Sequence, residues 1–187
     1  MERSEAIDIL AEGRGDAISV ATMQSASPWY EAGQSDGDHV DASACMGSAS
    51  SLGLGLAIAR PDRKVMVLDG DGSLLMQLGS LVSIAESSPA NFYHFVFANG
   101  LNQSTGNQPV PGQGKFDWTA LALASGYRHA MKIEAAEDLI EQLPQILELE
   151  GPVLIDLTIA REETPPRFPG ISMAGQVAKL KQRLAGH

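Results

Sequence analysis

Asp71 and Asn99 are the residues of this chain best suited to hold a divalent cation. Asp71 lies in the run GDGS at residues 70–73, and Asn99 opens the run NGL at residues 99–101. Mg²⁺ prefers hard oxygen ligands and commonly bridges a carboxylate to substrate phosphates. The carboxylate of Asp71, the amide oxygen of Asn99 and the backbone carbonyl of Leu101 could therefore share one metal ion.

The GDGS run itself has the composition of a phosphate-binding turn. Gly70 and Gly72 let backbone N–H groups approach a phosphate, and Ser73 offers a hydroxyl donor at the start of a helix, where negative charge is favoured. The alternative is an ordinary strand-to-helix turn, and an Asn-Gly pair is also common turn chemistry. The two motifs together, each after an apolar strand, are more specific than either alone.

Two other readings of the glycine-rich stretches are excluded or disfavoured by spacing. A calcium loop beginning at Asp69 would have Leu74 where glycine is needed and Ser80 where a bidentate glutamate is needed. The run GLG at residues 53–55 has no third glycine at dinucleotide-binding spacing, so we interpret it as a site of close helix packing.

The elements that must position these motifs alternate along the chain. Short apolar runs bounded by polar, Gly or Pro residues predict buried strands at residues 17–22, 64–69, 91–98, 128–133 and 152–159. A Gly/Ala-rich helix is expected over residues 47–59. One-face helical spacing is also shown by Leu78, Leu81, Val82 and Ala85, and by Leu139, Leu143, Ile146 and Leu147.

This alternation predicts an α/β fold with three layers, in which a mostly parallel sheet is covered by helices on both faces. Ligands of such sheets bind outside the carboxyl ends of the strands. Asp71 and Asn99 each follow a predicted strand, so we expect them at the same edge if those strands are neighbours.

Composition limits the remaining possibilities. The 187 residues have no linker-like segment, which indicates a single domain, and the net charge of −10 with scattered basic residues argues against nucleic-acid binding. The single cysteine, Cys45, excludes an internal disulfide and is interpreted as a buried filler. The sequence has neither a membrane-length apolar run nor a signal-like start, so we expect a cytoplasmic protein.

The GDGS run, the 25 residues that follow it and the Asn-Gly pair resemble the diphosphate-binding signature of thiamine diphosphate (ThDP) enzymes. The likeness extends over most of the chain, from the helix with the run MGSASSLGLGLA to the run GPVLIDLTIA. The run STGNQP after the Asn-Gly pair is similar to the corresponding loop of phosphonopyruvate and sulfopyruvate decarboxylases. The resemblance implies one diphosphate-binding domain over residues 1–187, with ThDP and Mg²⁺ as cofactors.

The resemblance also assigns roles to individual residues. Asp71, Asn99 and the Leu101 carbonyl would bind Mg²⁺, while Gly70, Gly72 and Ser73 would lie at the diphosphate. Met46 would support the bent cofactor, and the carbonyl of Ala44 would face its aminopyrimidine ring. Family members often have Asn or Asp before the ligand asparagine, whereas this chain has Ala98.

No part of the chain resembles the pyrimidine-binding domain, which supplies an activating glutamate. The resemblance therefore implies a separate alpha subunit that completes a hetero-oligomer. This arrangement favours the beta subunit of sulfopyruvate decarboxylase, which converts 3-sulfopyruvate to sulfoacetaldehyde and CO₂. Alternatives are phosphonopyruvate decarboxylase, another split ThDP enzyme (acetolactate synthase-like or a 2-oxoacid oxidoreductase beta subunit), and a non-catalytic scaffold of the same fold.

Four polar residues near the expected ligand edge are candidates for contact with an anionic 2-oxoacid substrate: His39, Ser104, Thr105 and Gln108. Polar groups that merely stabilise loops are the alternative for all four. Of the other histidines, His94 and His129 lie in predicted strands and are interpreted as structural, and His187 as a frayed terminus.

Overall fold

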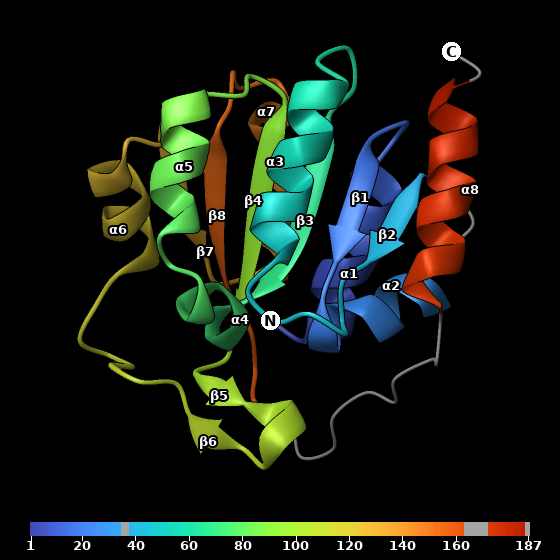
Figure 1. The fold of residues 1–187 in the computed structure, drawn as a ribbon. Helices are drawn as coiled ribbons and strands as arrows, with labels where there is room; N and C mark the ends of the chain where they lie inside the picture. Colours follow the sequence, from blue (N-terminus) through green and yellow to red (C-terminus); the bar gives the residue numbers. More distant parts are fainter. Residues whose placement is uncertain (35–37, 163–171, 186–187) are drawn as a thin grey trace.

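The computed structural model describes residues 1–34, 38–162 and 172–185. Its centre is a six-stranded parallel sheet in the order β2-β1-β3-β4-β8-β7. The strands are β1 (Ile18–Ala21), β2 (His39–Asp41), β3 (Val65–Gly70), β4 (Phe92–Ala98), β7 (His129–Ile133) and β8 (Val153–Thr158). A two-stranded antiparallel hairpin of β5 (Leu101–Asn102) and β6 (Gln108–Pro109) projects beyond the carboxyl edge (Figure 1).

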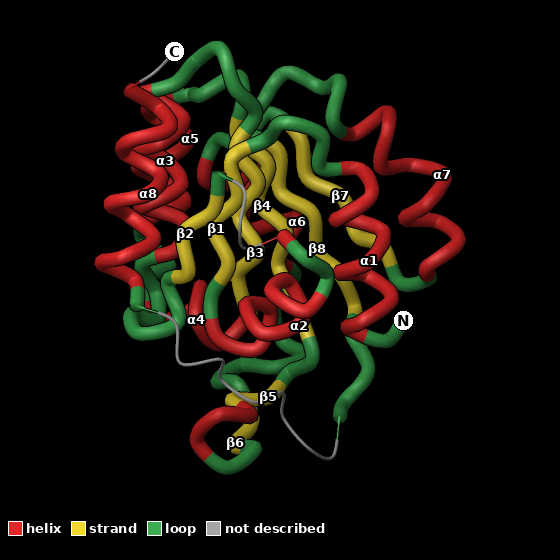
Figure 2. Tube along the Cα trace, turned by 90° about the vertical axis from the view of Figure 1, so that its right-hand side faces the viewer, coloured by secondary structure: helices red, strands yellow, loops and turns green. Residues whose placement is uncertain are grey.

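Helices cover both faces of the sheet and form a three-layer α/β fold, as the alternating pattern predicts (Figures 1 and 2). One face carries α3 (Ala49–Ala59), α5 (Ser80–Ser87), α6 (Trp118–Ser125) and α8 (Met173–Ala185). The other carries α1 (Arg3–Gly13), α2 (Ala26–Glu31) and α7 (Ala136–Ile146). A short helix, α4 (Asp71–Met76), and the 3₁₀ turns η1 (Met23–Ser25) and η3 (Gln103–Thr105) lie at the carboxyl edge.

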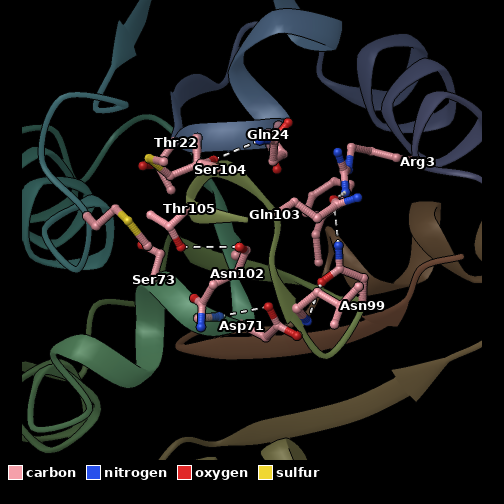
Figure 3. Close-up of a pocket in the computed structure, with 17 residues that line it drawn as sticks. Arg3, Thr22, Gln24, Asp71, Ser73, Asn99, Asn102, Gln103, Ser104 and Thr105 are labelled. Carbon is pink, nitrogen blue, oxygen red and sulfur yellow. Dashed lines mark hydrogen bonds between the residues drawn. The ribbon is translucent and has the colours of Figure 1, made fainter. Parts of the chain in front are cut away.

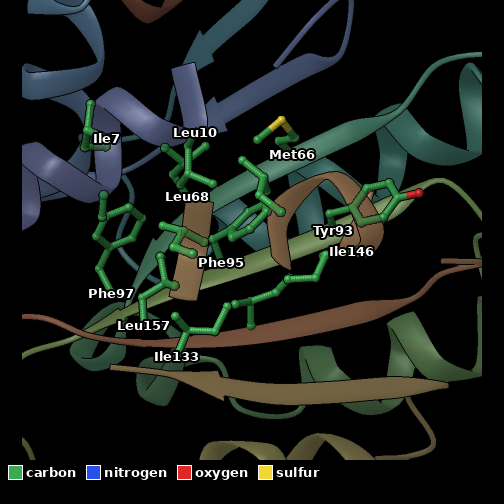
Figure 4. Packing of buried hydrophobic residues seen from close by; sticks show 14 of the residues in the cluster. Ile7, Leu10, Met66, Leu68, Tyr93, Phe95, Phe97, Ile133, Ile146 and Leu157 are labelled. Carbon is green, nitrogen blue, oxygen red and sulfur yellow. The ribbon is translucent and has the colours of Figure 1, made fainter. Parts of the chain in front are cut away.

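The two faces of the central strands fill two separate cores. Alternate residues of β3 and β4, such as Leu68 and Phe95, pack against Ile7 and Leu10 of α1 and Ile146 of α7 (Figure 4). The residues between them pack against α3 and α5. Because β3, β4 and β8 are buried on both faces, their sequences are nearly continuous apolar runs, which is why they could be located from sequence.

The register of β3 and β4 brings the two motifs to one edge. Gly70 pairs with Phe97 in adjacent parallel strands, so Asp71 and Asn99 emerge side by side. The crossover between them contains α4 and α5. The expectation that neighbouring strands place both residues at the same edge is confirmed.

Two details differ from expectation, and a third falls outside the described residues. Val82 is 59% exposed, because α5 begins only at Ser80 and turns Leu81 and Ile84, not Val82, toward the sheet. Cys45 is exposed in the loop before α3 and does not fill a core. His187 lies outside the described residues.

Short elements without a strong apolar pattern, such as β2 and the β5–β6 hairpin, are absent from the sequence-based expectation. Within the described ranges, none of the helices has the length and apolarity needed to cross a bilayer.

Candidate functional site

A pocket lies at the carboxyl ends of β1, β3 and β4, where the sheet topology predicts ligand binding (Figure 3). Its walls come from η1, the loop before α3, the turn between β3 and α4, and the chain that follows β4 through η3. Asp71, Asn99 and Leu101 all line it, together with Gly70, Gly72 and Ser73. Seven residues are predicted to bind the cofactor, and all of them except Ala44 line this pocket beside Asp71.

Asp71 is a buried carboxylate that points into this pocket. It is 5% exposed, and burial raises the pKa of its carboxyl group. Two backbone N–H groups oppose that effect: Gly72 donates to Oδ1 at 2.7 Å and Gly100 donates to Oδ2 at 2.6 Å. Each carboxylate oxygen keeps a further lone pair, so the group can still coordinate a cation.

Asn99 presents its amide beside that carboxylate. Its Oδ1 accepts the backbone N–H of Leu101 at 2.8 Å, and its Nδ2 donates to Oε1 of Gln103 at 2.8 Å. Leu101 pairs in register with Pro109, which has no N–H to donate to the Leu101 carbonyl. Amide and carbonyl oxygens thus lie within the same loop that Asp71 holds through Gly100.

Gly72 of the GDGS turn lets the side chain of Asn102 approach the turn closely. A Cβ placed on Gly72 would meet Oδ1 of Asn102 at 2.1 Å. That amide oxygen is buried and has no hydrogen-bond partner. Ser73 accepts the backbone N–H of Gly47 through Oγ at 3.0 Å, which connects the turn to the loop before α3.

These features fit a phosphate-bound Mg²⁺ ion. An unpartnered amide oxygen and a buried carboxylate facing a pocket are both suited to a hard cation or a bound hydroxyl donor. The described residues contain no cluster of three or more His, Cys, Asp or Glu side chains, so any metal here would rely on amide, carbonyl and ligand oxygens beside Asp71.

Arg3 and Gln103 line the pocket and were not anticipated from the sequence. Arg3, at the first position of α1, is 2% exposed and donates from Nη2 to Oε1 of Gln103 at 2.6 Å. Burial lowers the pKa of Arg3, while Glu162 and Asp71 oppose that shift. The only sequence signal is a charged residue early in an otherwise ordinary amphipathic helix, which does not reveal that the side chain turns inward.

The remaining predicted residues are distributed unevenly. Met46 lines the pocket, whereas Ala44 is exposed in the same loop and is not part of the lining. Ser104 and Thr105 line the outer part, and Ser104 accepts a hydrogen bond from Gln24 at 2.7 Å. Gln108 lies outside the lining but bonds to Thr105 across the hairpin, with Thr105 Oγ1 donating to its Oε1 at 2.8 Å.

His39 is not brought to the pocket. It occupies β2 opposite Ser19 and is 3% exposed, with Nδ1 2.9 Å from the Ser19 hydroxyl oxygen. Burial and the charge of Arg14 lower the pKa of His39 to about 3. The expectation that it lies at the ligand edge is wrong, because its strand begins at that residue and only Asp41 reaches the edge. His94 is buried between Asp69 and Tyr127, which agrees with a structural role.

Comparison with known proteins places this site in a family. Residues 22–157 match the family described as thiamine pyrophosphate enzyme, C-terminal TPP binding domain. Phosphonopyruvate decarboxylase from Streptomyces viridochromogenes is 40% identical over 152 residues, which cover 81% of this chain and 38% of that protein. The chain thus spans less than half the length of this relative.

A second relative has nearly the same length. Sulfopyruvate decarboxylase subunit beta from Methanothermobacter thermautotrophicus is 34% identical over 159 residues, which cover 85% of this chain and 82% of that subunit. Among solved structures, the thiamine diphosphate-dependent 4-hydroxybenzoylformate decarboxylase of Rhodococcus jostii RHA1 superposes with a TM-score of 0.71 at 25% identity. That superposition covers 88% of this chain and 33% of the other.

Proposed function

The chain belongs to the thiamine pyrophosphate enzymes as a C-terminal TPP-binding domain, and we propose that it is the beta subunit of a 2-oxoacid decarboxylase. The observation that carries the proposal is the convergence of Asp71, Asn99 and Leu101 on one pocket that also contains the GDGS turn. Two backbone hydrogen bonds only partly offset the cost of burying the Asp71 carboxylate at this pocket, so a bound cation would stabilise it further, which a non-catalytic scaffold would not require.

Each part of the pocket has a task in this proposal. Asp71 and Asn99 would hold Mg²⁺ with the Leu101 carbonyl, and the backbone at Gly72 and the hydroxyl of Ser73 would hold the diphosphate. When bound, ThDP supplies the electron sink for decarboxylation. Met46 would support the cofactor from the loop before α3, and the Ala44 carbonyl would face its aminopyrimidine ring.

The proposal includes a second subunit. Three relatives that match this chain are described as subunit beta of sulfopyruvate decarboxylase, which implies an alpha partner for those proteins. We infer that an alpha subunit with a pyrimidine-binding domain, carrying the activating glutamate, completes the site of this chain. The pocket at the carboxyl edge would then lie between the two subunits.

The proposed substrate is 3-sulfopyruvate, because the sulfopyruvate decarboxylase beta subunit is the relative whose length this chain nearly spans. Phosphonopyruvate is the second candidate, because two phosphonopyruvate decarboxylases are 40% and 44% identical over 152 and 114 residues, against 34% over 159 residues for that beta subunit. Ser104 and Thr105 line the outer pocket and are the groups we propose for the sulfonate or phosphonate. Gln108 could support them through its bond to Thr105.

Calorimetric titration of ThDP with Mg²⁺ tests the half-site. We expect weak binding to this chain alone and tight binding when an alpha subunit encoded beside it is co-expressed. Tight binding to the isolated chain would contradict the need for a partner. Decarboxylation of 3-sulfopyruvate, phosphonopyruvate and pyruvate by the complex then decides the substrate, and absence of all three activities in a cofactor-loaded complex would overturn the decarboxylase proposal.

A further inference from the structure

We propose that Arg3 and Gln103 are positioning residues that set which end of the Asn99 amide faces the metal. The inference rests on the proposed function, since it gives Asn99 its role as a metal ligand. It concerns two residues of this chain that lie behind that ligand and come from α1 and η3, remote in sequence from the GDGS turn (Figure 3).

The orientation of the Gln103 amide is determined by neighbours that can act in only one way. Arg3 Nη2, which can only donate, approaches Gln103 Oε1 at 2.6 Å. On its other side, Gln103 Nε2 donates at 2.9 Å to the backbone carbonyl of Glu162, which can only accept. A reversed Gln103 amide would place donor against donor and acceptor against acceptor.

With Gln103 held in this way, the Asn99 amide also has a single favourable orientation. Oε1 of Gln103 accepts a second hydrogen bond, from Nδ2 of Asn99, at 2.8 Å. On the other side the N–H of Leu101 donates to Oδ1 of Asn99 at 2.8 Å. Flipping Asn99 would break both bonds, so its oxygen remains turned away from Gln103 and toward the N–H of Leu101.

The hydrogen-bonded chain from Arg3 through Gln103 to Asn99, called the relay below, is buried. Arg3 is 2% exposed and Gln103 is 5% exposed, so water cannot readily replace either partner. Arg3 is itself held by an ion pair from Nη1 to Glu162 at 2.7 Å. At the start of α1, Glu5 accepts the backbone N–H of Glu2 at 2.8 Å in a capping box, which fixes the turn that carries Arg3.

The pocket gives Arg3 an electrostatic role as well. Among the described lining residues, Arg3 and Asp71 are the charged side chains. The guanidinium group therefore polarises the Gln103 carbonyl in a low-dielectric setting, which strengthens the bond to Asn99. Outer partners of this kind orient the groups that contact a metal, and their loss typically weakens metal affinity about 10- to 100-fold.

The relay is tested by measuring Mn²⁺ affinity in the presence of ThDP. The full chain is used with its alpha subunit, and electron paramagnetic resonance detects the bound ion. Gln103→Leu removes the shared acceptor, and we expect Mn²⁺ affinity to fall about 10- to 100-fold. Gln103→Glu keeps an acceptor for Arg3 and Asn99 but loses the donor to the Glu162 carbonyl, so it should bind Mn²⁺ more tightly than the Leu variant and more weakly than the wild type. Arg3→Met should weaken binding, while Arg128→Met, a control at an exposed ion pair with Glu150, should not.

Thermal unfolding of each variant identifies a purely structural effect. Wild-type affinity in folded Gln103→Leu, or equal losses in the Leu and Glu variants, would overturn the relay while leaving the proposed function intact. If the wild-type complex binds neither Mn²⁺ nor ThDP, the proposed function fails instead. The relay is then judged in the metal-free chain, where the side-chain NH₂ resonances of Asn99 must shift on Gln103→Leu; unchanged resonances contradict it.

Discussion

The carboxylate of Asp71 accepts the backbone N–H of Gly100 at 2.6 Å, and this bond joins the turn after β3 to the loop after β4. It connects positions 29 residues apart in the chain, next to the two strands that the sheet register makes neighbours. The two motifs are thus tied together by the chain itself. A cation at this edge would find its ligand loops already held in place, which lowers the cost of ordering them on binding.

Asp71→Asn should show how much the negative charge of Asp71 contributes to cofactor binding and how much its hydrogen bonds contribute to stability. The amide can accept only one of the two N–H groups that the carboxylate now accepts, so we expect a loss of about 1–3 kcal/mol in the free energy of unfolding. Mg²⁺-dependent ThDP binding should fall by at least about 100-fold, since the anionic ligand is lost. Urea unfolding and calorimetry measure the two effects, and retained activity in the complex would show that Asp71 is not a metal ligand.

Gly72→Ala should obstruct the diphosphate position. The new Cβ would lie 2.1 Å from Oδ1 of Asn102, so the hairpin must move or the amide must turn into the pocket. We expect ThDP affinity to fall about 10-fold or more, with a small change in stability. Gly79→Ala is the matched control because its Cβ would meet nothing within 4 Å, and equal affinities for the two variants would contradict the assignment.

Much of the fold was predictable because the central strands are buried on both faces. Their apolar runs mark β3, β4 and β8 within a residue or two, and their alternation with helices gives the layers and the common edge of Asp71 and Asn99. The strand β2 has three residues and the hairpin strands two each, too short for any periodicity to show.

The parts of the site that sequence did not reveal depend on tertiary direction. Arg3 lies on a helix whose pattern is that of a surface helix, and only the packing of α1 on the sheet turns its side chain toward Gln103. His39 was placed wrongly for the same reason, since its distance from the strand end determines whether it reaches the edge. Asn102 has an ordinary loop composition, and only the fold shows its oxygen to be buried without a partner.

Two glycines of α3 offer a matched test of helix-on-sheet packing. A Cβ on Gly53 would lie 2.3 Å from Cγ2 of Val67 and 3.1 Å from Phe92, so Gly53→Ala should destabilise the chain by about 1–3 kcal/mol. Gly55→Ala faces open space and should stabilise it by about 0.5–1 kcal/mol through helix propensity. Urea unfolding of both variants measures this; the same sign for both would contradict the close approach of α3 to β3.

His39 should make the chain sensitive to acid. Its folded-state pKa of about 3 lies below the ordinary value of 6.5, so the unfolded chain binds the proton more readily. The stability due to neutral His39 is therefore complete above about pH 6.5 and is lost as the pH falls toward 3, by at most about 5 kcal/mol at 1.36 kcal/mol per pKa unit.

His39→Asn keeps a polar partner for Ser19 but cannot take up this proton, so it isolates the contribution of the histidine. The difference in unfolding free energy between wild type and variant should favour the wild type near pH 7 and shrink or reverse by pH 4. Comparing the two proteins cancels the carboxylates that also titrate in this range. His129→Asn, at a partly exposed strand position, is the control. If the difference in unfolding free energy between wild type and His39→Asn stays constant with pH, His39 is not held neutral by burial.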